Sequence, residues 1–74
     1  MHYRERIRAL REDNDYTQMQ IANILNISQR TYADYELGNT RIPVDSLIIL
    51  AKFYNVSMDY ISGTSSRKDI FPTI

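Results

Sequence analysis

The chain has 74 residues, which is enough for one domain but not for a large catalytic cleft. Hydrophobic residues make up 43% of the chain and charged residues 24%, which is typical of a globular protein and excludes wholesale disorder. Nine basic residues balance nine acidic residues, so the net positive charge typical of nucleic-acid-binding proteins is missing, and non-specific DNA binding should be weak.

The residues that the chain lacks narrow its class further. It has no cysteine, so packing must stabilise the fold without disulfides, which fits a reducing environment. His2 is the only histidine, so we expect neither a metal site nor a cofactor. No apolar run approaches the roughly 20 residues that cross a bilayer, and MHYRERIRAL lacks the apolar core of a signal peptide. We therefore expect a cytoplasmic protein with no membrane partner.

The first predicted helix runs from about residue 3 to residue 13. One face of it carries the apolar residues Tyr3, Ile7 and Leu10. The series Arg4, Arg6 and Arg8 alternates with other residues, which is more typical of a solvated helix face than of an arm that binds DNA. Asn14 and Asp15 tolerate a left-handed backbone and are expected to close this helix.

The segment from Thr17 to Glu36 is predicted to form two short helices joined by a tight turn. Thr17 can cap the first helix, because its hydroxyl can accept from the amide of Gln20 while the Gln20 side chain reaches back. Asn26 tolerates the left-handed backbone of a helix end, and Ser28 supplies a new N-cap. This pattern is typical of a helix-turn-helix that reads DNA, although the spacing alone fits any helical hairpin about equally well.

The same segment separates inward from outward residues. The first of its helices has a narrow apolar stripe made by Ile21, Ala22 and Leu25. The second is expected to turn Tyr32 and Tyr35 inward. Its outward positions are Gln29, Arg30, Ala33 and Asp34. The outward face is therefore short and polar, with hydrogen-bond donors near its N-terminus.

Two further helices are predicted in the second half of the chain. Gly38 begins a loop of turn-forming residues, and Pro43 suits the first turn of a fourth helix, where the amide it lacks would be unpaired. The buried stripe of this helix consists of Leu47, Leu50, Ala51 and Tyr54. Asn55 can end it. Ser57 can cap a short fifth helix, which Gly63 can terminate. The apolar residues of that helix are Met58, Tyr60 and Ile61.

These elements predict an all-α, compact five-helix domain over residues 1–63. Residues 64–74 form a C-terminal tail that is first polar and then carries the apolar residues Ile70, Phe71 and Ile74. Because apolar residues after a polar spacer tend to pack on another surface, the tail is a candidate dimer contact.

The pattern as a whole resembles the Cro/repressor-type helix-turn-helix family of bacterial and phage transcriptional regulators. The resemblance covers about residues 4–63 and is specific, because caps, core positions and the distal segment VSMDYISG agree with one another. The matching residues are Arg11, Thr17, Gln18, Ile21, Ala22, Ser28, Tyr35, Glu36, Gly38, Pro43, Leu47, Leu50, Ala51, Lys52, Val56, Ser57, Met58, Asp59 and Tyr60. It implies a lambda-repressor-like DNA-binding fold whose third helix, residues 28–37, lies in the major groove.

The resemblance also implies roles for particular residues. Gln29 and Arg30 match base-reading positions, and their side chains can pair bidentately with adenine and guanine. Asp34 stands where the family often has a basic or amide residue. It could accept from a cytosine amino group, face solvent, or pair with Arg30. The positions matching phosphate contacts are Gln18, Thr31, Asn39, Thr40 and Arg41. Arg11 and Glu36 match a structural ion pair.

We therefore expect a sequence-specific transcriptional regulator, a repressor that binds a pseudo-palindromic operator as a homodimer formed through helix 5 and the tail. The alternative is a protein-interaction module such as an antitoxin or an anti-repressor, which the zero net charge and Asp34 favour. An enzyme is not expected, because the single histidine is near the N-terminus and the carboxylates are scattered. No small-molecule ligand is evident from the sequence.

Overall fold

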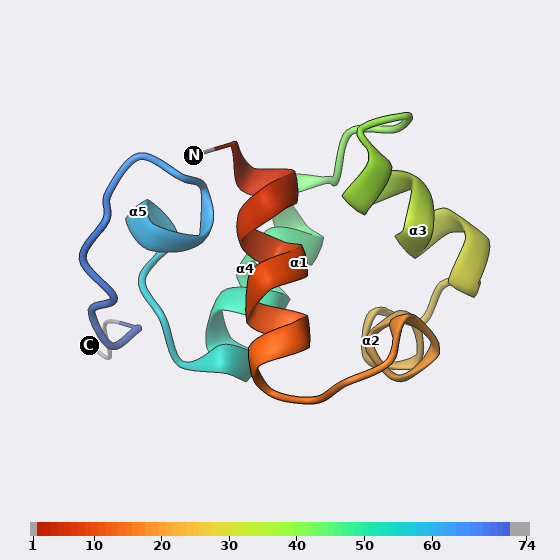
Figure 1. The fold of residues 1–74 in the computed structure, drawn as a ribbon, viewed down its shortest axis with the longest axis horizontal. Coiled ribbons are helices and arrows are strands. Elements are labelled where there is room, and N and C mark those ends of the chain that lie inside the picture. The colour runs from red at the N-terminus through yellow and green to blue at the C-terminus, as the bar shows by residue number, and fades with distance from the viewer. Residues whose placement is uncertain (1, 72–74) are drawn as a thin grey trace.

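The computed structural model describes residues 2–71 of the chain, and five α-helices form within that range. They are α1 (Tyr3–Asp13), α2 (Gln18–Leu25), α3 (Gln29–Leu37), α4 (Val44–Tyr54) and α5 (Met58–Ile61). In Figure 1, α1 crosses the middle of the molecule in front of α4, with α2 and α3 on one side and α5 on the other. No strand occurs in the described range, which confirms the predicted all-α fold with a helix-turn-helix.

The helix-turn-helix has the predicted caps. Thr17 Oγ1 accepts from the Gln20 amide at 3.1 Å, and Gln20 Oε1 accepts from the Thr17 amide at 2.8 Å. Asn26 ends α2 in a left-handed conformation with φ of 58°, and Ser28 Oγ accepts from the Thr31 amide at 3.1 Å. The backbone therefore stops and restarts a helix within three residues, as the sequence predicts.

Two helix ends differ from the expectations, and a third has a cap that was not predicted. Asp15 is left-handed with φ of 61°, but Asn14 is not, and its side-chain Nδ2 instead donates to the Leu10 carbonyl at 2.7 Å. Pro43 lies one residue outside α4 as its N-cap, with an extended backbone, and not in the first turn. His2 caps α1, because its Nδ1 accepts from the Arg4 amide at 3.2 Å.

The core is formed by apolar side chains from all five helices and the α4–α5 connection. Its buried members are Ile7, Leu10, Ile21, Ala22, Leu25, Tyr32, Tyr35, Leu47, Leu50, Ala51, Val56 and Ile61. This set contains every apolar residue predicted to face inward in α2 and α3. Tyr32 is completely buried and meets Tyr35 edge to face, with 6.4 Å between ring centroids. α3 is therefore held against the body by two aromatic rings.

The expectation that the Arg4, Arg6 and Arg8 series is solvated is wrong for Arg6, which is buried. Its guanidinium lies 3.8 Å from the centroid of the Tyr60 ring, and its Nη1 donates to the Ser65 carbonyl at 3.4 Å. A guanidinium can be buried in this way because an aromatic face and a carbonyl oxygen replace part of its hydration. Arg6 thus joins α1 to α5 and the segment after it.

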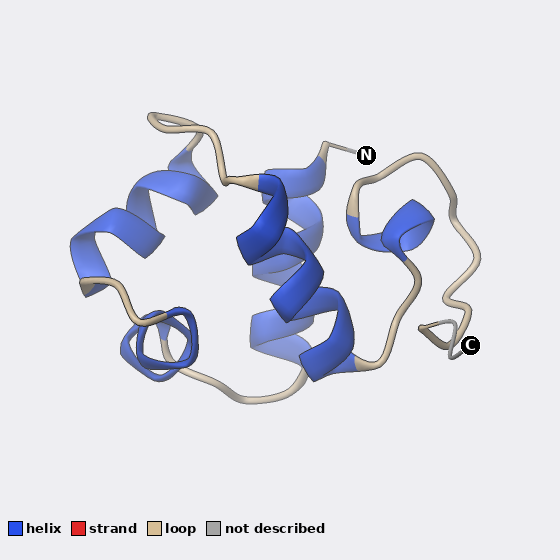
Figure 2. Ribbon diagram, turned by 180° about the vertical axis from the view of Figure 1, so that it is seen from behind, coloured by secondary structure: helices blue, strands red, loops and turns tan. Residues whose placement is uncertain are grey.

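The segment after α5 folds back on the body of the molecule (Figure 2). The Ser57 amide donates to the Asp69 carbonyl at 2.8 Å, and Phe71 is half-buried against the core. Ile70 is exposed, and Ile74 lies outside the described residues. The division into residues 1–63 and a separate tail stays a prediction, but the described part of the tail packs on its own chain.

Tyr54 yields a testable prediction, because its hydroxyl is buried without a hydrogen-bond partner among residues 2–71. An unsatisfied hydroxyl costs stability, so we expect Tyr54→Phe to have an equal or larger free energy of unfolding at neutral pH in urea titrations. Burial also raises the pKa of Tyr54 above the ordinary tyrosine value. The unfolded chain then ionises first, so stability should fall as the pH rises above about 10, and should fall less in the variant. A loss above about 1 kcal/mol at neutral pH would mean that the hydroxyl has a partner.

Candidate nucleic-acid interface

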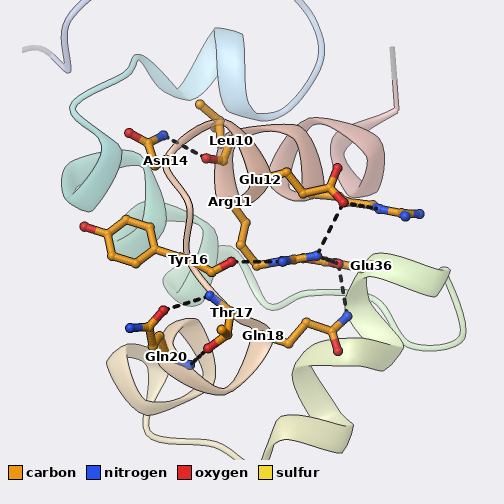
Figure 3. Close-up of polar contacts among 10 residues, drawn as sticks. Leu10, Arg11, Glu12, Asn14, Tyr16, Thr17, Gln18, Gln20 and Glu36 are labelled. Atoms are coloured by element: carbon orange, nitrogen blue, oxygen red, sulfur yellow. Dashed lines mark hydrogen bonds and ion pairs between the residues drawn. The ribbon is translucent and has the colours of Figure 1, made fainter.

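An ion pair between α1 and α3 lies beneath the helix-turn-helix (Figure 3). Arg11 Nε donates to Glu36 Oε2 at 2.7 Å and Arg11 Nη2 donates to Glu36 Oε1 at 3.1 Å, so the guanidinium grips the carboxylate with two parallel bonds. The Glu36 side chain is 3% exposed and that of Arg11 13% exposed. Arg11 Nη1 also donates to the Tyr16 carbonyl at 3.0 Å. The pair therefore ties α1, the α1–α2 connection and α3 together.

The charges of the pair are mutually stabilised. Burial by itself raises the pKa of Glu36, but the hydrogen bonds from Arg11 and Gln18 and the Arg11 charge outweigh it, so the pKa lies below the ordinary glutamate value. The hydrogen bond to Glu36 raises the pKa of Arg11 above its ordinary value. Both groups are therefore charged at neutral pH, and Arg11 is not a free cation that could bind phosphate.

Gln18, a candidate phosphate contact, is the first residue of α2 and is half-buried. Its Nε2 donates to Glu36 Oε1 at 3.2 Å, so its position is fixed by the ion pair (Figure 3). A primary amide has two N–H donors, and one remains for another acceptor. The unpaired amides and the positive dipole end of α2 lie at the same place and favour an anion.

Gln29 and Arg30, the candidate base-reading residues, occupy the first turn of α3 and are both exposed. Neither side chain has a hydrogen bond or ion pair within residues 2–71. Thr31 follows them and is half-buried, with its Oγ1 2.9 Å from Ser28 Oγ. Two long polar side chains are thus presented to solvent from a turn that is capped and fixed.

Asp34, the third candidate base-reading residue, is half-buried and belongs to the C-terminal part of α3. It forms no ion pair with Arg30 in the described chain. Instead, Asn39 Nδ2 donates to Asp34 Oδ1 at 3.4 Å, and the Asn39 amide donates to the Asp34 carbonyl at 3.0 Å. The Thr40 amide reaches the same carbonyl at 3.4 Å. Asp34 therefore organises the loop after α3, in which Asn39, Thr40 and Arg41 are exposed.

Arg4 lies beside this loop, a position that no pattern in the sequence predicted. A Cβ added at Gly38 would lie 2.8 Å from Arg4 Nη1, so the guanidinium rests on the glycine that ends α3 with φ of 83°. A cation at a helix C-terminus interacts favourably with the dipole of that helix. The contact joins residues 34 positions apart, which is why no local pattern in the sequence indicated it.

The described residues contain neither a cluster of three metal-ligating side chains nor a helix long and apolar enough to span a membrane. The site consists of exposed amide, guanidinium and hydroxyl groups around α3.

The chain is similar to known proteins in sequence and in fold. A family model described as "Helix-turn-helix" matches residues 7–61. The chain is 39% identical over 67 residues to the uncharacterized HTH-type transcriptional regulator YobD of Bacillus subtilis (strain 168), a match that covers 90% of this chain and 60% of that protein. It is 35% identical over 68 residues to the cryptic phage CTXphi transcriptional repressor RstR of Vibrio cholerae, covering 90% and 61%.

A solved structure supports the same relationship. The crystal structure of a transcriptional regulator from Listeria innocua is similar with a TM-score of 0.82 and 30% sequence identity, over 89% of this chain and 62% of that one. The chain therefore spans about three-fifths of the length of the relatives it matches.

The ion pair gives a second prediction. We expect Glu36→Gln to lower the free energy of unfolding at neutral pH by about 3 kcal/mol, because it leaves the Arg11 charge largely buried without its counter-charge. The folded-state pKa of Glu36 is lowered, so its contribution is complete above the ordinary glutamate pKa and is lost as the pH falls through the lowered value. The difference between wild type and variant should therefore shrink on acidification, measured by urea unfolding near neutral pH and near pH 3.

Glu12→Gln is the matched control. Glu12 pairs with Arg8 at 3.4 Å and its Oε2 lies 4.0 Å from Arg11 Nη2, but the Glu12 side chain is 53% exposed, where a salt bridge contributes little. This change should therefore cost less than about 1 kcal/mol. Equal losses in the two variants would show that the Arg11–Glu36 pair has no special structural role.

Proposed function

The chain belongs to the helix-turn-helix family of transcriptional regulators, and we propose that it binds specific double-stranded DNA by placing the exposed face of α3 in the major groove. The observation that carries the proposal is the exposure of Gln29 and Arg30 on the first turn of α3, where neither has a partner in the described chain. An exposed polar side chain is hydrated and needs no partner within the fold, so it is available to bind a base.

We assign base reading to Gln29 and Arg30. Gln can pair bidentately with N6 and N7 of adenine, and Arg with O6 and N7 of guanine, each pair contributing about 1–3 kcal/mol of discrimination. Asp34 could accept from a cytosine amino group, but its contacts with Asn39 favour a role in holding the loop after α3.

Phosphate binding is assigned to the edges of the same surface. The candidates are Gln18 at the start of α2, Thr31 in α3, and Asn39, Thr40 and Arg41 in the loop after α3. Such contacts fix the orientation of α3 on the duplex without reading its sequence. Because the chain has a net charge of zero, we expect its affinity for DNA to depend more on base contacts than that of a strongly basic DNA-binding protein.

We further propose that the protein is a homodimer that represses transcription from a pseudo-palindromic operator, with recognition helices about 34 Å apart. The name of the Vibrio cholerae relative describes a repressor, and this supports the direction of regulation. A DNA-reading function requires no catalytic group and no cofactor, and it places the protein with the DNA, in the cytoplasm of a bacterium.

Selection of bound duplexes from a random DNA pool tests base reading. We expect a two-fold symmetric consensus, and we expect Gln29→Ala and Arg30→Ala each to weaken binding to it by about tenfold to a hundredfold, as loss of a bidentate base pair predicts. Fluorescence anisotropy at fixed salt gives the affinities. Arg67→Ala, in the segment after α5, is the control and should bind as wild type does. Unchanged affinity in both α3 variants would exclude the assigned reading residues.

Arg41 gives a separate prediction about the loop. Arg41→Ala should weaken binding to consensus and unrelated duplexes by a similar factor and should reduce the slope of log K against log salt by about one, because a phosphate contact is indifferent to sequence. Titrations at several salt concentrations measure both quantities. A loss confined to the consensus duplex would instead make Arg41 a base-reading residue.

A further inference from the structure

The outward side of α4 carries apolar residues that the core does not use. Leu47, Leu50 and Ala51 face the core. Ile49 on the opposite side is 43% exposed, and Phe53 on the flank of the helix is 39% exposed. Asp45 and Lys52 lie along the same outward stripe and are exposed. We call these four residues, Asp45, Ile49, Lys52 and Phe53, the α4 face. Figure 2 shows the molecule from this side, with α4 in front.

The charges on the α4 face are arranged for pairing with a copy of itself. Asp45 and Lys52 are seven residues apart, which is two helical turns or about 10.5 Å, and Ile49 lies between them. If two α4 helices pack antiparallel about a two-fold axis midway between residues 48 and 49, each Asp45 lies opposite the Lys52 of the second copy. The same axis brings the two Ile49 side chains together. A self-complementary surface of this kind is what an isologous dimer contact requires.

We propose that the α4 face is the surface through which two copies of this chain associate. The inference rests on the proposed function, because reading a two-fold operator requires a dimer. Phe53 extends the apolar centre toward the Tyr16 ring, with centroids 5.2 Å apart, and Lys52 Nζ lies 5.6 Å from the Phe71 centroid at the opposite edge. The apolar part of the α4 face, Ile49 and Phe53, is therefore continuous with these rings, and the charged side chains of Asp45 and Lys52 lie beside it.

This dimer is compatible with DNA binding. The two-fold axis of an antiparallel pair runs across α4 within the interface, and this direction leads from the α5 side of the molecule to the side that holds α2 and α3 (Figures 1 and 2). Both copies of α3 then lie on the same side of the dimer, where one duplex can meet both. A face-to-face contact on α2 or α3 would instead cover the residues that read DNA.

Within residues 2–71, helix 5 and the tail expose less apolar surface than α4 does. Ile61 is buried, Met58 and Tyr60 pack against the core, and Phe71 is half-buried on the same body. Ile70 is exposed but lies beside the charged residues Lys68 and Asp69. The observations therefore favour α4 over α5 as the centre of the dimer contact.

A charge-exchange experiment tests the proposal without DNA. Asp45→Lys makes the α4 face doubly positive and Lys52→Asp makes it doubly negative, so each variant alone should self-associate about tenfold more weakly than wild type. An equimolar mixture of the two should recover association as a heterodimer, and the double variant D45K/K52D should recover it as a homodimer. Sedimentation equilibrium from micromolar to millimolar protein gives the constants, and circular dichroism checks folding.

Asp59→Lys is the matched control, because it reverses an exposed charge in the first turn of α5 and should leave association unchanged. The proposal is overturned if wild type stays monomeric over the whole range, if the single variants associate as wild type does, if the mixture and double variant fail to recover, or if Asp59→Lys is equally disruptive. These results are independent of DNA binding, which the selection experiment measures separately, so failure of either proposal can be told from failure of the other.

Discussion

The bidentate ion pair between Arg11 and Glu36 is the contact on which the geometry of the proposed DNA-reading surface depends. It joins α1 to α3, and through the Tyr16 carbonyl and Gln18 it also fixes the start of α2. A guanidinium and a carboxylate paired in this way define an orientation as well as a distance. Apolar contacts alone define the orientation less strictly. The Tyr32 and Tyr35 rings supply burial, whereas the ion pair sets how α3 is turned relative to α2.

Local chemistry explains what the sequence could predict. The caps at Thr17 and Ser28 and the left-handed turn at Asn26 involve residues at most five positions apart, so their pattern is visible in the chain. The inward tyrosines follow from helical spacing in the same way. The exposure of Gln29 and Arg30 also follows from helical spacing, because residues on the side of α3 opposite its buried stripe face solvent.

The features that the sequence did not predict from local patterns depend on contacts between residues far apart in the chain. Arg11 and Glu36 are 25 positions apart, and only the family resemblance indicated their pairing. Arg6 holds a position that its spacing from Tyr3, Ile7 and Leu10 places on the buried side, but its charge argued against burial. The Tyr60 ring that accommodates it lies 54 positions later in the chain, beyond any local pattern. The contact between Arg4 and Gly38 was not predicted for the same reason.

The neutral net charge conceals an uneven distribution. Arg8, Arg11 and Arg67 are paired with carboxylates, and Arg6 is buried against Tyr60. No such ion pair is formed within residues 2–71 by Arg30 in α3, by Arg41 in the following loop, or by Arg4, an α1 residue that lies beside the C-terminal end of α3. The cations left without carboxylate partners thus include three at α3, and a balanced chain can still offer a locally positive surface there.

Amide chemical shifts recorded while a high-affinity duplex is added to the isotopically labelled protein test the central claim most directly. If α3 reads DNA on a mount fixed by Arg11 and Glu36, the largest changes fall on residues 28–34 and 39–41 and on the start of α2, while the amides of Arg11 and Glu36 change little. Changes concentrated on α4 or α5, with the first turn of α3 unaffected, would contradict the account.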